Sequence, residues 1–302
     1  MFIVKHRKIF ISISAVLVVV AIALLSIFGL KFGIDFKGGA QLEVLYSEGR
    51  PEQTLLAEKI DVLNIGDALI QPAGENEYSI KIRDLTEAEH QALLRATSID
   101  GKYKVEEKSF NSIGPSVGKE LARKATIALI LVSLGIVFFI AYAFRKASHP
   151  VSSWKYGLIA IVTLLHDVLI SVGLFALVSH FAGVEVDTLF VVAVLTVLGL
   201  SVSDTIVVFD RIRENLRTHA GEKFEEIVGR SIKQTYARSI STSLTVILAL
   251  LALLVFGPVT TKYFALVLVI GMFFGAYSSI FLASPLLVAW EKVQGKKPSG
   301  KK

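Results

Sequence analysis

Six apolar runs, each long enough to cross a lipid bilayer, constrain this chain of 302 residues more than any other feature of its sequence. A membrane-spanning helix needs about 20 mainly apolar residues, and its backbone must satisfy its own hydrogen bonds inside the hydrocarbon. Hydrophobic residues make up 53% of the chain, which suits a multi-span membrane protein. The sequence therefore predicts a polytopic α-helical membrane protein with six transmembrane helices, at residues 9–30, 125–144, 156–180, 186–209, 240–257 and 263–290.

The first apolar run has two interpretations, an uncleaved span or a signal peptide. It follows Lys5, Arg7 and Lys8, and a helix over Ile9–Leu30 would reach about 33 Å. A signal peptide would have a shorter apolar core and would end in a small-x-small cleavage site. The residues of Ser26–Leu30 offer no convincing site of this kind. We therefore expect an uncleaved first span, with residues 1–8 in the cytosol.

The positive charges indicate the orientation of the spans. Lys and Arg are frequent in segments 210–238 and 291–302, and Arg145, Lys146 and Lys155 lie between the second and third runs. The segment between the third and fourth runs has no Lys or Arg. Cytosolic loops carry an excess of positive charge, so we expect both termini in the cytosol and residues 31–124 outside it. The same flanking pattern accounts for the net charge of +6 without nucleic-acid binding.

Residues 31–124 form the one sizeable soluble region and carry alternating strand and helix signals. Apolar residues recur every second residue in three segments and at helical spacing in residues 51–63, and residues 68–71 are expected to form a short strand. Thr86 followed three residues later by Glu89 indicates a capping box, and His90 is expected to be solvated. The order predicts a small extracytoplasmic α+β domain of the ferredoxin-like βαββαβ type. Its expected elements are strand 40–46, helix 51–63, strand 68–71, strand 77–83, helix 86–97 and strand 103–110.

Disulfides and clustered metal ligands are not expected in this small domain. The chain has no cysteine, and the domain has no His, Asp or Glu group at metal-binding spacing. A core of this size is marginal alone, so we expect the membrane or a partner to stabilise it.

A glycine-rich segment, GIDFKGG, links the first span to the domain. Gly33, Gly38 and Gly39 can adopt conformations closed to other residues, which favours a structural turn that also contains Asp35. The segment does not match a phosphate-binding loop, because it neither follows a strand nor opens a helix. We expect no cofactor there.

Asp204 is the residue of the spans whose place in an apolar run most needs an explanation. It lies in the fourth apolar run, about five residues before the charged end. An ionised carboxylate near the bilayer centre costs about 2.5–3.5 kcal/mol on insertion scales, and less near the interface. Asp204 is therefore either neutralised by a partner or protonated for part of its working cycle. Arg238, at the start of the fifth run and on the same membrane face, is the best candidate partner in the sequence.

Other polar side chains occur at similar depth in three spans. Asp167 in the third span shares a helix face with Thr163 and Ser171, because these residues recur at intervals of four. Polar groups from several spans are tolerated only when they face one another or water. They favour a proton path, in which the possible supporting residues are His166, Asp167, Ser201 and Thr242.

Several motifs of the chain resemble the SecF family, the smaller membrane subunits of the bacterial SecD–SecF translocase accessory complex. The resemblance covers nearly the whole chain, and the fourth-span motif is long and specific. The motifs are GIDFKGG (33–39), SIGPSVGKELARKA (112–125), His166-Asp167-Val168, SVSDTIVVFDRIREN (201–215) and RSISTSLT (238–245).

This resemblance implies a subunit without enzymatic activity, of the resistance–nodulation–division superfamily, in the bacterial inner membrane. Such a subunit pairs with SecD and assists the SecYEG channel and the SecA motor, with YajC and YidC as possible further partners. It uses the proton gradient to help move unfolded preproteins late in translocation. The proton-relay residues of the family carry over to Asp204 and Arg238, and a further relay carboxylate is expected on SecD.

Three other functions remain open from the residues. An intramembrane aspartyl protease would use Asp167 and Asp204, although Asp204 follows Ser-Val-Ser rather than Gly-x-Gly. Half of a proton-driven small-molecule exporter of the same superfamily would usually have a larger outer domain. A structural assembly factor would tolerate replacement of Asp204.

Overall fold

The computed structural model describes residues 2–144, 153–219 and 221–295, and these form two compact units. One unit is a helical bundle, and the other is an α/β domain made of residues 32–127 and 185–188. Arg145, Lys146 and the tail from residue 296 lie outside the described residues. The bundle contains α1 (Phe2–Lys5), α2 (Arg7–Phe28), α7 (Ser153–Ala182), α8 (Thr188–Thr218), α9 (Phe224–Phe256), α10 (Val259–Ser278), the π-helix η1 (Ser279–Ala283), α11 (Ser284–Gly295) and most of α6 (Pro115–Ala143).

Six helices are long and apolar enough to cross a membrane, which confirms the predicted polytopic class. The helices α8 and α9 continue well beyond their apolar runs, as α8 ends at Thr218 and α9 begins at Phe224. These extensions are held by apolar side chains, among them Ile212, Val228 and Ile232, which are buried in the bundle core. Much of the basic segment 210–238 is therefore helical.

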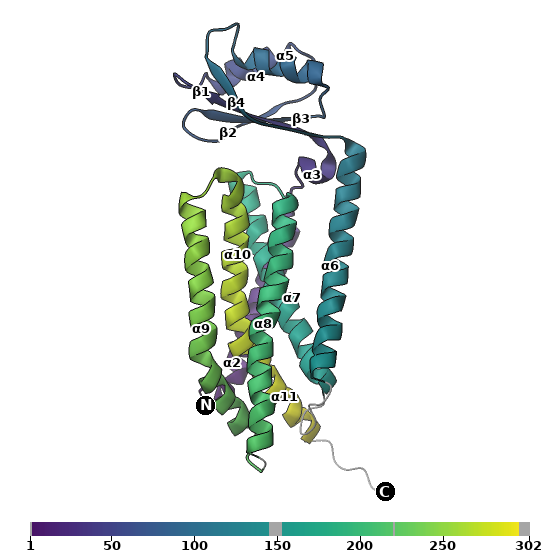
Figure 1. Ribbon diagram of the computed structural model, residues 1–302, viewed down its shortest axis with the longest axis vertical. Helices are drawn as coiled ribbons and strands as arrows, with labels where there is room; N and C mark the ends of the chain where they lie inside the picture. The colour runs from purple at the N-terminus through teal and green to yellow at the C-terminus, as the bar shows by residue number, and fades with distance from the viewer. Residues whose placement is uncertain (1, 145–152, 220, 296–302) are drawn as a thin grey trace. The chain divides into compact units, whose positions relative to one another are not determined.

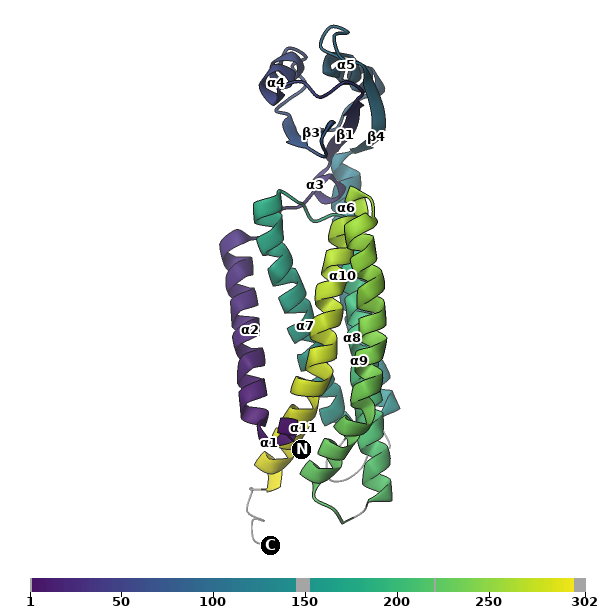
Figure 2. The same ribbon diagram turned by 90° about the vertical axis from the view of Figure 1, so that its left-hand side faces the viewer.

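The bundle has inner and peripheral helices, as Figures 1 and 2 show. In the apolar windows of the third, fourth and sixth spans, 56%, 44% and 56% of the residues are buried. The corresponding shares for the first, second and fifth spans are 11%, 6% and 11%. Because apolar side chains need no burial in protein when lipid surrounds them, α2, α6 and α9 are suited to face lipid or other helices.

Small residues set the closest contacts between the bundle helices. A Cβ atom added to Gly173 would lie 2.7 Å from the backbone oxygen of Ala21, so α2 and α7 touch at this glycine. A Cβ on Gly275 would lie 3.2 Å from the Cβ of Ser201, so α10 also packs closely on α8 at a glycine. These approaches agree with the expectation that small residues let membrane helices pack tightly.

The sixth span contains a π-helical turn that its apolar pattern did not indicate. The turn η1 separates α10 from α11, and Pro285 follows directly within α11. Proline lacks a backbone N–H and clashes with the preceding turn of a helix, so a widened turn accommodates it. Single π-turns inside helices are frequent at functional sites.

The α/β domain has the predicted βαββαβ order. Its four strands form one antiparallel sheet in the order β2-β3-β1-β4, and the core includes the fully buried Leu42, Leu56, Ile80 and Leu93. This strand order is that of a ferredoxin-like sheet, which confirms the expected type. The elements are α3 (Ile34–Lys37), β1 (Gly39–Tyr46), α4 (Gln53–Asp61), β2 (Leu69–Pro72), β3 (Glu77–Ile82), α5 (Glu87–Thr97) and β4 (Val105–Ile113).

The two local predictions for α5 have opposite outcomes. The capping box is confirmed, because the Thr86 backbone N–H donates to Glu89 Oε2 (2.8 Å) and the Glu89 N–H donates to Thr86 Oγ1 (3.4 Å). The expectation of a solvated His90 is wrong, because this residue is only 6% exposed. Its ring stacks on Phe110 with 3.6 Å between centroids, and its Nε2 lies 3.1 Å from Glu107 Oε2. The helix packs this face onto β4, so an apparently polar face is covered.

Candidate functional site

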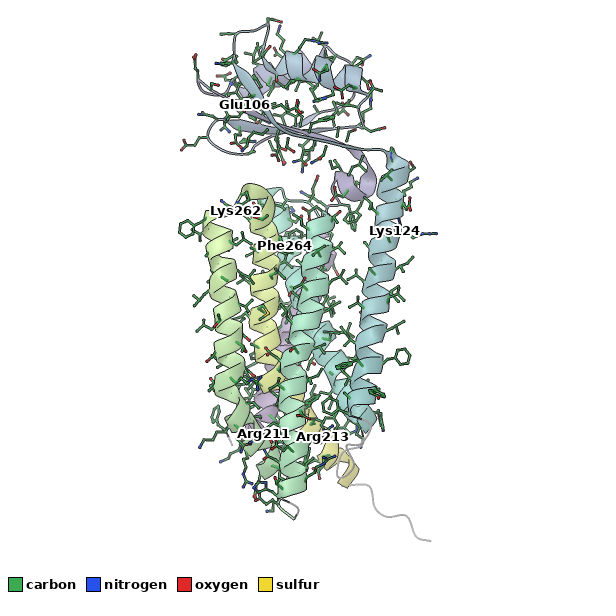
Figure 3. The ribbon with its side chains drawn as sticks, viewed as in Figure 1. Glu106, Lys124, Arg211, Arg213, Lys262 and Phe264 are labelled. Carbon is green, nitrogen blue, oxygen red and sulfur yellow. The ribbon has the colours of Figure 1, made fainter. Side chains whose placement is uncertain are left out.

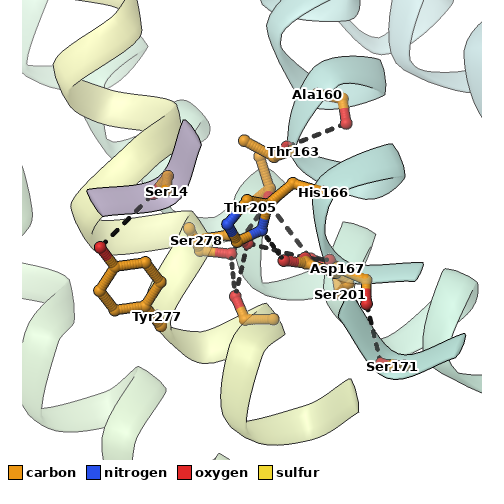
Figure 4. A network of polar contacts seen from close by, with 12 residues as sticks. Ser14, Ala160, Thr163, His166, Asp167, Ser171, Ser201, Thr205, Tyr277 and Ser278 are labelled. Carbon is orange, nitrogen blue, oxygen red and sulfur yellow. Dashed lines mark hydrogen bonds and ion pairs between the residues drawn. The ribbon is translucent and has the colours of Figure 1, made fainter. Parts of the chain in front are cut away.

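Asp167 is the centre of a buried polar network in the bundle (Figure 4). Its side chain is completely inaccessible to solvent. Ser201 of α8 donates to Asp167 Oδ2 (2.5 Å), and Ser278 of α10 donates to the same oxygen (2.7 Å). One carboxylate thus connects α7, α8 and the end of α10, which is where the π-turn begins.

His166 completes the coordination of this carboxylate. Its Nδ1 lies 2.8 Å from Asp167 Oδ1, and its ring is 3% exposed. Its Nε2 is buried without a hydrogen-bond partner among the described residues. Tyr277 stacks over the imidazole with 6.3 Å between centroids and accepts a hydrogen bond from Ser14 of α2 (3.4 Å).

Further hydroxyl groups surround the network without touching the carboxylate. Thr205 Oγ1 and Ser279 Oγ lie 2.9 Å apart and join α8 to the π-turn. Ser171 donates only to the backbone oxygen of Asp167 (2.8 Å). Ser278 and Ser279 are not among the residues predicted from the sequence, although adjacent serines shortly before Pro285 in an apolar run were an available signal.

Asp204 has different surroundings, one helical turn after Ser201 on α8. It is partly exposed, and Ser243 of α9 donates to its Oδ2 (3.1 Å). Arg238 lies on α9 with an exposed side chain and lines a cleft that also contains Asp210. Both Asp204 and Arg238 are described, and no ion pair or hydrogen bond joins them in this structure.

Thr242 also makes no side-chain contact with the carboxylates. Its hydroxyl donates to the backbone oxygens of Arg238 (2.9 Å) and Ser239 (3.0 Å), as a threonine within a helix often does. Of the predicted site residues, the structure therefore brings together His166, Asp167 and Ser201. Among the remaining three, all of them described, no ion pair or side-chain hydrogen bond joins Asp204 to Arg238 or Thr242, and Thr242 meets Arg238 only at its backbone oxygen.

The basic residues of the bundle are unequally distributed between its ends. Figure 3 shows Arg211 and Arg213 at one end and Lys262 at the other. At the end that holds the two arginines, Arg7 donates to Glu225 (2.8 Å), and Lys292 also contacts this carboxylate. The ion pairs connect α2, α9 and α11 where the chain leaves the apolar region.

The glycine-rich segment is held in place by hydrogen bonds within the α/β domain. Asp35 accepts hydrogen bonds from the backbone N–H (2.8 Å) and the hydroxyl (2.7 Å) of Thr188, and the Gly33 N–H donates to Val186 (2.9 Å). Gly38 has a φ of +83°, and a Cβ on Gly118 would lie only 2.8 Å from its backbone nitrogen. The segment thus turns the chain against the start of α6.

No metal site is apparent in the described part of the chain, which has no group of three or more His, Cys, Asp or Glu side chains suited to hold a metal ion. The polar network around Asp167 consists of hydroxyl groups and one imidazole. These groups can hold or pass a proton.

The comparisons with known proteins agree with this architecture. Residues 94–293 match the family model for the C-terminal region of the protein export membrane proteins SecD/SecF, and residues 23–49 match the model for the SecD/SecF GG motif. The protein translocase subunit SecF of Thermobaculum terrenum is 43% identical over 96% of this chain and 93% of its own length.

Two longer relatives also match. The protein translocase subunit SecDF of Bacillus subtilis is 32% identical, and this chain spans 39% of its length. The crystal structure of SecDF from Thermus thermophilus, a translocon-associated membrane protein, matches with a TM-score of 0.81 and 31% identity, over 96% of this chain and 38% of that one. The chain therefore belongs to the SecD/SecF family of protein export membrane proteins, and it matches SecF subunits over nearly their whole length.

Proposed function

We propose that this chain is the SecF subunit of a bacterial protein translocase, and that it pairs with a SecD subunit to use the proton motive force in preprotein translocation. The relatives named SecF and SecDF support the role in translocation. In the SecDF relatives, a region like this chain makes up less than half of one longer polypeptide. A separate SecD subunit would supply the remainder here.

The observation that carries this proposal is the environment of Asp204. Its only side-chain hydrogen bond among the described residues is from the neutral Ser243, and no cation contacts it. An ionised carboxylate costs about 2.5–3.5 kcal/mol at the membrane centre and less near the interface, and a hydrogen bond from one neutral hydroxyl offsets only part of this cost. A carboxylate in this position is suited to bind and release a proton during a conformational cycle.

Arg238 is the residue proposed to neutralise Asp204 whenever the carboxylate has released its proton. It lies on α9, five residues before Ser243, so the helix that contacts Asp204 also carries the guanidinium group. A rearrangement of α9 against α8 would bring the cation to the ionised carboxylate, and protonation of Asp204 would release it. Thr242, one turn after Arg238, would follow the same movement.

The membrane potential can drive such a cycle. Each elementary charge that crosses about 100 mV gains about 2.3 kcal/mol, which is sufficient to bias two conformations strongly. The proposed orientation has both termini in the cytosol of a bacterial cell and the α/β domain outside the inner membrane. In this position the subunit would act on unfolded preprotein with SecYEG and SecA in late translocation, and YajC and YidC are possible further partners.

An intramembrane aspartyl protease is a weaker alternative. Such an enzyme needs two aspartates that face one another across one site. Asp167 is enclosed by Ser201, Ser278 and His166, whereas Asp204 contacts Ser243 on another helix. The two carboxylates therefore occupy separate environments.

The experiment that tests the proposal is preprotein export in cells that depend on this chain. Asp204→Asn keeps the size of the side chain but cannot ionise, so we expect export to fall at least tenfold. Asp204→Glu should retain part of the activity. Asp210→Asn is the matched control, because Asp210 is an exposed aspartate on the same helix.

Membrane insertion and co-purification with SecD are measured in the same cells. An intact complex without export in Asp204→Asn supports a titrating carboxylate. Normal export in that variant would contradict the proposed proton relay through Asp204, and the chain would then be a structural partner of SecD.

A further inference from the structure

The relay proposed above leaves the most deeply buried carboxylate of the bundle, Asp167, without a role. We propose that Asp167 and His166 form a second proton-holding site, and that Ser201 and Ser278 transmit its charge to the fourth and sixth spans. The inference rests on the proposed function, because the site would serve a bundle through which protons pass. It adds a second exchangeable proton to the one on Asp204.

The hydrogen bonds around the Asp167 side chain all point towards its carboxylate. Asp167 Oδ2 accepts from the hydroxyls of Ser201 and Ser278, while Oδ1 faces His166 Nδ1 at 2.8 Å. Three groups that can donate to one completely buried side chain are arranged to stabilise its ionised form. A buried carboxylate of this kind still needs a compensating charge, and the imidazole is the one group in its described contacts that can provide a positive charge.

One ring nitrogen of His166 has no hydrogen-bond partner among the described residues. When Nδ1–H donates to the ionised carboxylate, Nε2 presents a lone pair, and this atom is buried without a partner. Buried polar atoms of side chains are nearly always satisfied, so an unsatisfied imidazole nitrogen is unusual. It is positioned to accept the entering proton.

The proton balance of the site is simple. Neutral His166 beside ionised Asp167 has a net charge of −1, and uptake of one proton at Nε2 gives imidazolium and carboxylate with a net charge of zero. Transfer of the Nδ1 proton to Asp167 Oδ1 gives imidazole and carboxylic acid, which leaves the net charge at zero. Release reverses these steps, and no other reactant is required.

Ser278 links the carboxylate of Asp167 to the π-turn. Ser278 Oγ lies within hydrogen-bonding distance of Asp167 Oδ2 (2.7 Å) and of the backbone oxygen of Gly275 (3.2 Å). An ionised Asp167 attracts the hydroxyl proton, whereas a protonated Asp167 allows it to turn to Gly275. The charge of Asp167 therefore changes the bonding at the last residue of α10, directly before η1.

Few other ionisable groups face this pair. On α10, Tyr277 stacks on His166, and on α8 the contacts to Asp167 and its surroundings come from the neutral Ser201 and Thr205. On α2, Ser14 faces Tyr277. The nearest further carboxylate along α8 is Asp204, three residues after Ser201, or about 4.5 Å along the helix axis. Ionisation of either carboxylate would raise the cost of ionising the other.

The protonation state of His166 can be measured by ¹⁵N NMR of the histidine-labelled full-length chain, together with SecD, in lipid vesicles. The chain has six histidines, and His166→Gln identifies the signals of His166. We expect its ring nitrogens to change protonation state as the pH is varied. Asp167→Asn should shift the midpoint by about one pH unit or more, because the pair is coupled.

Matched serine variants separate a proton-holding site from a purely structural one. Ser278→Ala removes a hydroxyl that donates to the carboxylate, and it should shift the midpoint. Ser171 lies on α7, the helix that carries Asp167, and its hydroxyl binds the backbone oxygen of Asp167 rather than the carboxylate. Ser171→Ala should therefore leave the midpoint unchanged. Asp204→Asn should change the midpoint less than Asp167→Asn does.

The outcomes distinguish this inference from the relay. If the ring nitrogens of His166 stay in one form over the whole range, the pair is structural and the inference is overturned, whatever the export result. Equal shifts for Ser278→Ala and Ser171→Ala would overturn it as well. If His166 titrates as expected while Asp204→Asn exports normally, the relay through Asp204 fails and the second site stands.

Discussion

The helical bundle and the α/β domain hold their carboxylates under opposite conditions. In the bundle, Asp167 is completely buried among two serines and a histidine. In the domain, Glu89 lies at the surface, where it binds Arg83 and caps its own helix at Thr86. Surface pairs of this kind contribute little to stability, whereas a buried charge is costly and persists only where its surroundings compensate it. The comparison indicates that function, more than stability, explains the carboxylates of the bundle.

Asp167→Ala should have the largest effect on stability. The substitution leaves the hydroxyls of Ser201 and Ser278 and the imidazole of His166 buried without their acceptor. Each buried polar group that is left without its partner costs about 1–3 kcal/mol, and several such groups remain here. Thermal unfolding of the full-length chain in detergent, followed by circular dichroism, would measure this loss.

Asp167→Leu tests whether the cost comes from the missing acceptor alone, and Ser171→Ala serves as the control. A loss below about 1 kcal/mol for Asp167→Ala would mean that the network relaxes freely. The bundle would then tolerate loss of a carboxylate as well as the surface of the α/β domain does, and the contrast between the two units would fail.

In the α/β domain, the largest effect on stability should come from a substitution at the close backbone contact between Gly118 and Gly38. Gly118→Ala places a Cβ atom 2.8 Å from the backbone nitrogen of Gly38, and neither backbone can yield easily. Overpacking of this kind costs about 1–3 kcal/mol, and alanine's better helix propensity offsets up to about 1 kcal/mol of it. Hydrogen exchange of the β1 amides in the full-length chain would report the loss.

Gly135→Ala is the matched control on the same helix, because nothing lies within 4 Å of the added atom. It should leave β1 exchange unchanged. Equal exchange in the two variants would mean that the turn at Gly38 moves aside without cost, and that the GG segment is more adaptable than its contacts indicate.

The α/β domain could be predicted from sequence far better than the polar network could. Alternation in segments such as Glu77–Ile82 and the Thr86–Glu89 spacing are local signals, so the strand and helix order followed directly from them. His90 was misjudged because the packing of α5 on β4 is not local. Periodicity describes which face of a helix is apolar, but it does not say which neighbour covers that face.

In the bundle, the sequence indicated which residues were unusual but not which of them meet. Asp167, His166 and Ser201 were selected for their polarity, and the structure joins them. Ser278 was overlooked, because serine is common in membrane helices and the π-turn that positions it depends on Pro285 and on packing. The pairing of Asp204 with Arg238 rests on their shared membrane face and on the resemblance to SecF, and it stays a prediction, because depth does not determine the rotation of a helix about its axis.

Asp204→Asn should have a small effect on stability and a large one on export. Asparagine keeps an oxygen that can accept from Ser243, and the side chain is only partly buried. We expect the free energy of unfolding to change by about 1 kcal/mol or less. Thermal unfolding of the same preparation as for Asp167→Ala gives a direct comparison. A loss as large as that of Asp167→Ala would contradict the distinction between the two carboxylates.

The smallest effect concerns the surface charge of the α/β domain. Hydrogen bonds lower the pKa of Glu89 from 4.5 to about 2, and the bond from Arg83 contributes more than those from Thr86. A carboxylate with a lowered pKa contributes its stabilisation above the unfolded value, and this contribution disappears as the pH falls from about 4.5 towards about 2. Protection of the α5 amides from hydrogen exchange, relative to intrinsic rates, should therefore decrease modestly over this range.

Glu89→Gln removes the titrating group, and its α5 protection should lose this pH dependence. Added salt should also weaken the dependence in the native chain, because exposed ion pairs are screened. If protection in the native chain were constant with pH, the Arg83–Glu89 pair would have no energetic consequence. The contrast between this surface carboxylate and the buried Asp167 would then be sharper than their geometry alone indicates.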